Sequence, residues 1–235
     1  MLPPPPPVLV ILGTDAAGKD HVAELLLRRW RAAGYRVEKR AGGFSAPAVD
    51  ARSSSERKGR WGRFQERVFL SLFPLLRPWL LGAARLLLAR DRRRFHPPDG
   101  PLVVVSHTAL RLLALVLGQQ PEGLAALARF PALQRTLEAV VPATGAVAVV
   151  LDIDPAIRRR RIRRRLESGM ADPFDRYMLD DPERAERIER SLVELATRYL
   201  DATVIENDDL DDDALERALE RALRRAAPPA PREAS

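Results

Sequence analysis

The stretch VLVILGTDAAGKDHV, residues 8–22, constrains the fold more strongly than any other part of the chain. Its central GTDAAGK has the Gly-x-x-x-x-Gly-Lys spacing of a loop that binds phosphate. The run Val8–Leu12 is apolar and β-branched, as in a buried parallel strand, and an amphipathic helix is predicted from Asp20 onward. In that order, the backbone N–H groups of the loop and the helix N-terminus form a nest for phosphate oxygens. The competing interpretation is a plain strand-to-helix turn that contains two glycines.

The predicted phosphate loop supplies the candidate cofactor-binding residues. Lys19 is expected to neutralise the β- and γ-phosphates, a task that suits a flexible ammonium. The motif normally closes with Ser or Thr, whose hydroxyl helps to hold Mg²⁺, but Asp20 stands there. Its carboxylate could hold Mg²⁺ directly, whereas without a metal it would repel a triphosphate. Asp20 therefore either makes the metal more strictly required or weakens the site. The candidate loop residues are Gly13, Thr14, Asp15, Ala16, Ala17, Gly18, Lys19 and Asp20.

Composition narrows the class of protein. The 235 residues suit one domain with a sizeable core, and the lack of cysteine excludes disulfides and thiolate chemistry and favours a cytoplasmic location. The formal charge of +7 comes almost wholly from arginine, because only 3 of the 39 basic residues are lysine. We interpret this charge as a solvated basic surface, so nucleic acid is not an expected partner. No secretory signal or membrane span is expected, since Leu70–Leu88 is interrupted by Pro74, Arg77, Pro78 and Arg85.

The rest of the chain alternates between strand and helix patterns, which predicts an α/β fold. After Val8–Leu12, strands are predicted at residues 35–40, 102–105, 146–153 and 203–206. Further helices are predicted at residues 63–73, 78–94, 108–117, 123–130, 133–140, from 155, 181–200 and 212–225. One domain over residues 8–226 is expected, with disorder in the proline-rich start, 1–7, and in the tail, 227–235.

These residues resemble the thymidylate-kinase-like branch of the P-loop nucleotide kinases. The first loop of that family reads Gly-x-Asp-Gly-x-Gly-Lys-Ser/Thr, and GTDAAGKD matches it at Gly13, Asp15, Gly18 and Lys19. The resemblance implies that Asp15 lies near the acceptor nucleotide and the metal. It also places Lys39, in KRAGG, on an arginine of the family, which makes Lys39 a candidate substrate residue. The first loop is in addition similar to that of the polyphosphate-dependent nucleotide kinases.

A second part of the resemblance covers LDIDPAIRRRRIRRRL and the residues after it. In the family, an arginine-bearing helix leads into a lid over the phosphates, here about residues 166–178. The resemblance implies catalytic roles for Arg161 and Arg165. It implies a substrate role for Arg176, which matches the Asp-Arg that ends the lid. The alternative is that the arginines form a solvated helix face in an arginine-rich chain.

The sequence departs from the family after the third strand. The family places Asp-Arg-Tyr or Asp-Arg-His there, for Mg²⁺ and the acceptor phosphate, whereas this chain has Ser106, His107 and Thr108. His107 follows the carboxyl end of a predicted strand, where ligands bind in open α/β sheets. It therefore joins Lys39 and Arg176 as a candidate substrate residue.

The sequence thus predicts a single doubly wound α/β domain of the P-loop NTPase class, with five parallel strands flanked by helices and a lid. The expected function is ATP-dependent phosphoryl transfer, assisted by Mg²⁺, to a nucleotide or a similar small phosphate acceptor. A homodimer is compatible with it. The candidate catalytic residues are Asp15, Lys19, Arg161 and Arg165, and Asp20 is the candidate metal ligand. Two other interpretations stay open: a non-catalytic nucleotide-binding protein and an arginine-rich protein that binds nucleic acid.

Overall fold

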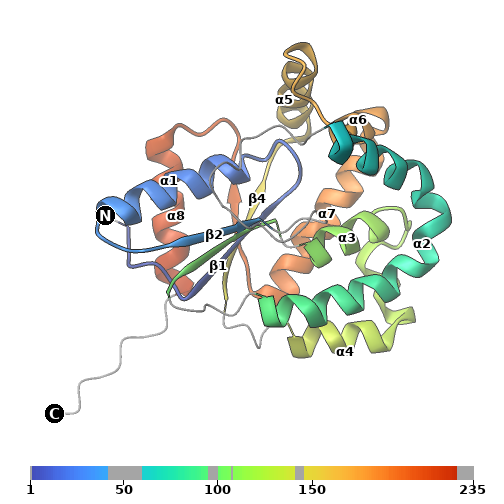
Figure 1. Ribbon diagram of the computed structural model, residues 1–235, viewed down its shortest axis with the longest axis horizontal. Helices are drawn as coiled ribbons and strands as arrows, with labels where there is room; N and C mark the ends of the chain where they lie inside the picture. Colours follow the sequence, from blue (N-terminus) through green and yellow to red (C-terminus); the bar gives the residue numbers. More distant parts are fainter. Residues whose placement is uncertain (1, 42–59, 95–99, 107, 141–145, 227–235) are drawn as a thin grey trace.

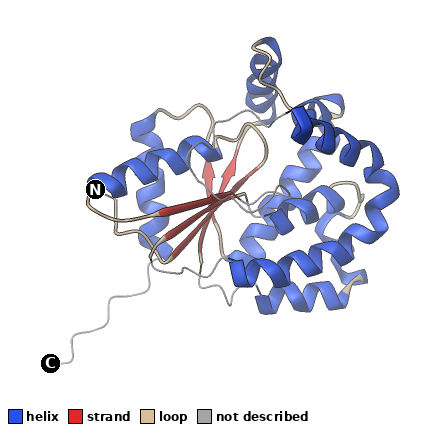
Figure 2. Cartoon of the chain, viewed as in Figure 1, coloured by secondary structure: helices blue, strands red, loops and turns tan. Residues whose placement is uncertain are grey.

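A parallel sheet of five strands forms the centre of the computed structural model, which describes residues 2–41, 60–94, 100–106, 108–140 and 146–226. The strand order is β2-β3-β1-β4-β5, and each neighbouring pair is parallel. Figure 2 shows the strands in the middle of the molecule with helices around them. This arrangement confirms the predicted fold class. The strands are β1 (Val8–Gly13), β2 (Glu38–Ala41), β3 (Leu102–Val105), β4 (Val147–Asp152) and β5 (Thr203–Glu206).

The central strand β1 is buried along its whole length. Because successive side chains of a strand point to opposite faces of the sheet, Leu9 and Ile11 join one apolar cluster while Val10 and Leu12 join the other. A strand with packed helices on both faces must be apolar on both sides. This requirement explains why the sequence shows a continuous apolar run here instead of an alternating pattern.

Helices cover both faces of the sheet (Figure 1). On one face lie α1 (Lys19–Ala32) and α8 (Asp212–Ala226), and their apolar sides share a cluster with Leu9 and Ile11. On the other face lie α3 (Thr108–Leu117) and α7 (Pro182–Leu200). Outside them run α2 (Arg60–Arg94), the short 3₁₀ helix η1 (Gly123–Arg129) and α4 (Pro131–Val140).

Helix α2 corresponds to two predicted helices, residues 63–73 and 78–94. The structure has one helical stretch in which the second limb, Trp79–Arg90, is bent by 118° from the first, Phe64–Leu76. The bend lies between Leu76 and Trp79. Among the described residues no single helix is long and apolar enough to cross a membrane, although the two limbs of α2 together meet the criterion by length and composition alone.

The predicted lid contains a helix that the sequence analysis did not identify. After α5 (Pro155–Glu167) the chain forms α6 (Pro173–Asp180), which begins inside the expected range 166–178 and ends two residues beyond it. The two carboxylates of a capping box explain its start, because Asp172 accepts from the Asp175 N–H while Asp175 accepts from the Asp172 N–H.

The proline-rich start was expected to be disordered, yet residues 2–7 have defined contacts. The indole Nε1 of Trp30 donates to the Pro3 carbonyl at 2.9 Å, and the N–H of Leu102 donates to the Pro7 carbonyl at 2.9 Å. Strand β2 begins three residues later than predicted, because the N–H of Tyr35 still closes the end of α1 on the Trp30 carbonyl. The predicted tail, 227–235, lies outside the described residues.

Candidate functional site

The predicted phosphate loop joins the carboxyl end of β1 to the start of α1. Gly13 and Gly18 have φ values of +151° and +89°, a region that L side chains rarely adopt. A Cβ atom on Gly18 would lie 2.8 Å from Nδ2 of Asn207, which itself donates to the Ala17 carbonyl at 2.7 Å. Both glycines of the motif are therefore required by the backbone of the loop.

Ala16 also adopts a left-handed conformation, with φ of +64°. This conformation costs an L residue about 1 to 2 kcal/mol. Its carbonyl accepts a hydrogen bond from Nη1 of Arg161 at 3.1 Å. The loop thus keeps a glycine-like turn at a position where this chain carries a methyl group.

The side chain of Lys19 lies inside the loop and is only 7% exposed. Its ammonium donates to the Thr14 carbonyl, and one oxygen of Asp15 lies 4.0 Å away. Burial lowers the pKa of Lys19 to about 8, an effect that the Asp15 carboxylate partly opposes and the Arg111 guanidinium strengthens. An anion that enters the loop would therefore stabilise the charged form of Lys19.

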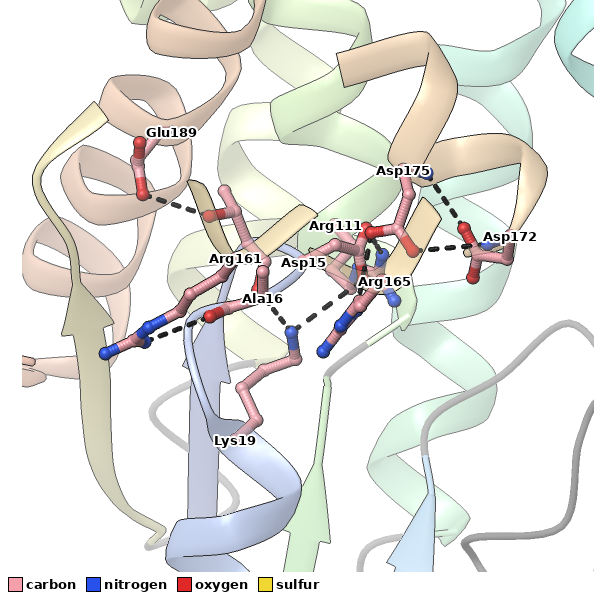
Figure 3. A network of polar contacts seen from close by, with 10 residues as sticks. Asp15, Ala16, Lys19, Arg111, Arg161, Arg165, Asp172, Asp175 and Glu189 are labelled. Atoms are coloured by element: carbon pink, nitrogen blue, oxygen red, sulfur yellow. Dashed lines mark hydrogen bonds and ion pairs between the residues drawn. The ribbon is translucent and has the colours of Figure 1, made fainter. Parts of the chain in front are cut away.

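Asp15 is held by an arginine that the sequence analysis missed. Nη2 of Arg111, on α3, donates to Oδ2 of Asp15 at 2.9 Å, and its guanidinium lies 5.5 Å from the ring centroid of Phe174 (Figure 3). One signal was present in the sequence, since Arg111 is the only charged residue in the apolar stretch of α3, TALRLLALVL.

Arg165 extends from α5 toward α6, where Nη1 lies 3.3 Å from Oδ1 of Asp175. Asp175 is buried, and its pKa is raised to about 6, chiefly by burial and also by the carboxylates of Asp172 and Asp15. Lys19, Arg165 and these carboxylates gather at one place beside the loop (Figure 3). The structure thereby joins the predicted loop to the predicted lid.

Arg161 contacts the backbone around the loop. Its Nη1 donates to the Ala16 carbonyl, whereas its Nη2 donates to the Asn207 carbonyl at 3.0 Å and to Oδ1 of Asp209 at 2.9 Å. Arg163, by contrast, is exposed on α5, while Ile162 is buried. Arg161 and Arg165 therefore meet the loop region and α6, whereas Arg163 faces water.

The remaining candidates lie at the edge of this cluster or beyond it. The Asp20 side chain is 73% exposed, and its Oδ1 lies 3.7 Å from Nζ of Lys39, which also donates to Glu24 at 2.8 Å. Arg176 is exposed on α6. His107 lies outside the described residues, within which no group of three or more His, Cys, Asp or Glu side chains is arranged to hold a metal ion.

Comparison with solved structures finds similar chains among nucleotide kinases. A thymidylate kinase from Candida albicans is 10% identical, covering 94% of this chain and 92% of its own, with a TM-score of 0.52. The chain has the P-loop kinase fold. A deoxyadenosine kinase from M. mycoides with bound dATP is 13% identical over 93% of this chain and 98% of its own, with a TM-score of 0.48. A polyphosphate kinase 2 from Arthrobacter aurescens TC1 is 17% identical over 93% of this chain and 67% of its own, with a TM-score of 0.42.

At 10% identity, the likeness to the thymidylate kinase shows the P-loop kinase fold alone, since one fold hosts many functions. No protein-family model and no curated protein matches the sequence. Function must therefore be argued from the side chains of the site.

The conformation of Ala16 leads to a stability prediction. Ala16→Gly should raise the free energy of unfolding by roughly 0.5 to 1 kcal/mol, because relief of the left-handed strain exceeds the added freedom of the unfolded chain. The neighbouring Ala17→Gly is the matched control and should lower it by about 1 kcal/mol, since Ala17 is buried and has no positive φ. Urea unfolding of the three proteins measures both changes, and a destabilised Ala16→Gly would contradict the argument.

The lowered pKa of Lys19 leads to a pH prediction. An anion in the loop stabilises the ammonium and so raises the pKa of Lys19. Because the pKa without an anion is about 8, binding near or above pH 8 takes up a proton. Affinity for inorganic tripolyphosphate should fall by up to about tenfold per pH unit above pH 8. Calorimetry between pH 7 and 9.5 measures this slope, and Lys19→Met should show weaker binding with no such slope. An equal slope in both proteins would contradict the assignment.

Proposed function

We propose that the protein transfers the γ-phosphoryl group of a nucleoside triphosphate to a nucleotide or a similar small phosphate acceptor. The observation that carries this proposal is the meeting of three cations beside one phosphate loop. The ammonium of Lys19 comes from the loop, the guanidinium of Arg111 from α3 and that of Arg165 from α5. Phosphoryl transfer depends mainly on positioning and charge neutralisation, which such an arrangement supplies.

Each cation has a distinct place in the proposed reaction. The loop N–H groups and Lys19 hold the β- and γ-phosphates of the donor. An acceptor phosphate oxygen attacks the γ-phosphorus, and the bond from that phosphorus to the β,γ-bridging oxygen breaks, so that a nucleoside diphosphate leaves. Because the attacking oxygen is already ionised, the step requires no general base. Arg111 and Arg165 offset the charge on the transferring group, while Asp15 keeps Arg111 in place through its ion pair.

Two further residues shape the donor side. Arg161 is proposed to hold the loop through the Ala16 carbonyl while phosphates are bound. Lys39, 3.7 Å from Asp20, is proposed to offset the charge of that carboxylate.

The residues present fit a magnesium ion that is held together with a bound triphosphate. Mg²⁺ commonly uses one or two carboxylates together with phosphate oxygens and waters. Asp20 offers one exposed carboxylate in the first turn of α1, directly after the loop lysine. When bound, Mg²⁺ would neutralise charge on the β- and γ-phosphates. ATP and Mg²⁺ are accordingly the proposed cofactors.

A non-catalytic nucleotide-binding protein is the second candidate. The observation that favours it is the position of the Asp20 carboxylate, which is largely exposed and lies 3.7 Å from the ammonium of Lys39. In that case the loop would bind a nucleotide without the metal-side group that transfer requires.

The kinase proposal is tested by a coupled ADP-release assay with ATP and Mg²⁺ across nucleoside monophosphates, nucleosides and polyphosphate. With the acceptor that responds, Arg111→Ala and Arg165→Ala should each lower kcat about tenfold or more with smaller changes in KM for ATP, because their contacts act mainly on the transferring group. Arg163→Ala, exposed on the same helix as Arg165, is the control and should behave as the parent protein.

Two outcomes would contradict the proposal. If no acceptor gives ADP release above that of Lys19→Ala, the binding-only function is favoured instead. If Arg163→Ala loses as much activity as Arg165→Ala, the arginines act as a diffuse charge and the assigned roles are wrong.

Exposed apolar side chains on both limbs of α2 support a homodimer as the form in which the protein works. Val68, Leu72 and Leu75 are exposed at spacings of four and three residues on the first limb, and Trp79 and Leu86, seven residues apart, are exposed on the second, with Trp79 78% exposed. Exposed apolar patches of this kind are typical of protein–protein contacts. We expect light scattering to give the mass of a dimer for the parent and of a monomer for Leu75→Glu/Trp79→Glu. Arg221→Glu, exposed on α8, should remain dimeric, and a monomeric parent would contradict the proposal.

A further inference from the structure

A buried ion pair lies behind the phosphate loop. Arg158 of α5 is 1% exposed and is among the largest fully buried side chains of the protein. Its guanidinium contacts Oε2 of Glu189, a buried residue of α7. The sequence analysis placed the arginines of this helix either in the lid or in water, so this burial was not expected.

Glu189 also reaches the loop itself. Its second oxygen, Oε1, accepts a hydrogen bond from the hydroxyl of Thr14 at 2.9 Å, which is the dashed line drawn from Glu189 in Figure 3. Arg158, Glu189 and Thr14 are all buried. Thr14 in turn offers its carbonyl to the ammonium of Lys19. Thr14 thus binds Glu189 through its side chain and the ammonium of Lys19 through its backbone carbonyl.

Stability alone does not account for this arrangement. A buried ion pair is costly to desolvate, and apolar side chains of similar size often serve a fold as well or better. An apolar pair between α5 and α7 would, however, offer no acceptor to the Thr14 hydroxyl. What the ion pair adds is a fixed carboxylate oxygen at the back of the loop.

We propose that Glu189, held by Arg158, is a positioning residue of the phosphate site. Through Thr14 it sets the direction of the carbonyl that orients the Lys19 ammonium. The inference rests on the proposed phosphate-binding role of the loop and extends it to residues of α5 and α7 that do not themselves touch the phosphates.

Thr14→Val tests the first link, because it removes the hydroxyl, nearly conserves the shape and leaves the ion pair intact. We expect its affinity for inorganic tripolyphosphate at pH 7 to fall about tenfold while its thermal midpoint stays within a few degrees of the parent. Thr14→Ser keeps the hydroxyl and should bind as the parent does. Parent-like affinity in Thr14→Val would overturn the proposal.

Arg158→Met/Glu189→Leu tests the second link. The apolar pair should restore a thermal midpoint near that of the parent and yet lose affinity to the same extent as Thr14→Val. Adding Thr14→Val to this pair should weaken binding no further, because the three residues act as one unit. If the pair does not fold, the comparison of Thr14→Val with Thr14→Ser decides the matter alone.

Two controls separate this inference from the proposed function. Glu183→Gln alters an exposed ion pair of α7, in which Glu183 and Arg187 lie 3.7 Å apart, and it should change neither affinity nor midpoint. Lys19→Ala should strongly weaken tripolyphosphate binding. Loss in Lys19→Ala without loss in Thr14→Val overturns the positioning role alone, whereas unchanged binding in Lys19→Ala overturns the phosphate site itself.

Discussion

The buried ammonium of Lys19 sets the conditions that the rest of the site must meet. A charge removed from water is unfavourable unless its neighbours offer opposite charge or hydrogen-bond acceptors. The Thr14 carbonyl and the Asp15 carboxylate do so here, but the guanidinium of Arg111 competes for the same carboxylate. Arg165 pairs with Asp175, whose pKa the nearby Asp172 carboxylate helps to raise. The ammonium of Lys19 lies 4.0 Å from the carboxylate that Arg111 contacts at 2.9 Å, so a phosphate group in the loop would give Lys19 a closer anionic partner.

Helix α5 connects this charge balance to the shape of the loop. Arg158, Arg161 and Arg165 are three and four residues apart, so they share one side of the helix. Arg158 contacts Glu189, the partner of Thr14. Arg161 contacts the Ala16 carbonyl, and Arg165 contacts Asp175 of α6. A shift of α5 would consequently disturb the loop backbone and the predicted lid together. The loop depends on side chains that are distant in sequence as much as on its own glycines.

The sequence was sufficient for the sheet and the loop but not for their partners. Apolar runs and the glycine spacing specify local structure, so β1 and the loop were predicted almost residue by residue. Arg111 and Glu189 act through contacts with residues far away in the chain, and periodicity carries no information about such pairs. Within a run of seven arginines, composition could not distinguish the buried Arg158 from the exposed Arg163. Only the packing of α5 against α7 makes that distinction.

Asp20 illustrates how tertiary contacts change the meaning of a motif residue. In the loop sequence alone, its carboxylate either holds a metal or repels phosphate. In the folded chain it lies in the first turn of α1, where the helix dipole favours an anion, and 3.7 Å from the ammonium of Lys39. Part of its charge is therefore offset within the protein itself. The proposed binding of Mg²⁺ by Asp20 would compete with Lys39 of β2, which keeps Glu24 of α1 as an anionic partner at 2.8 Å.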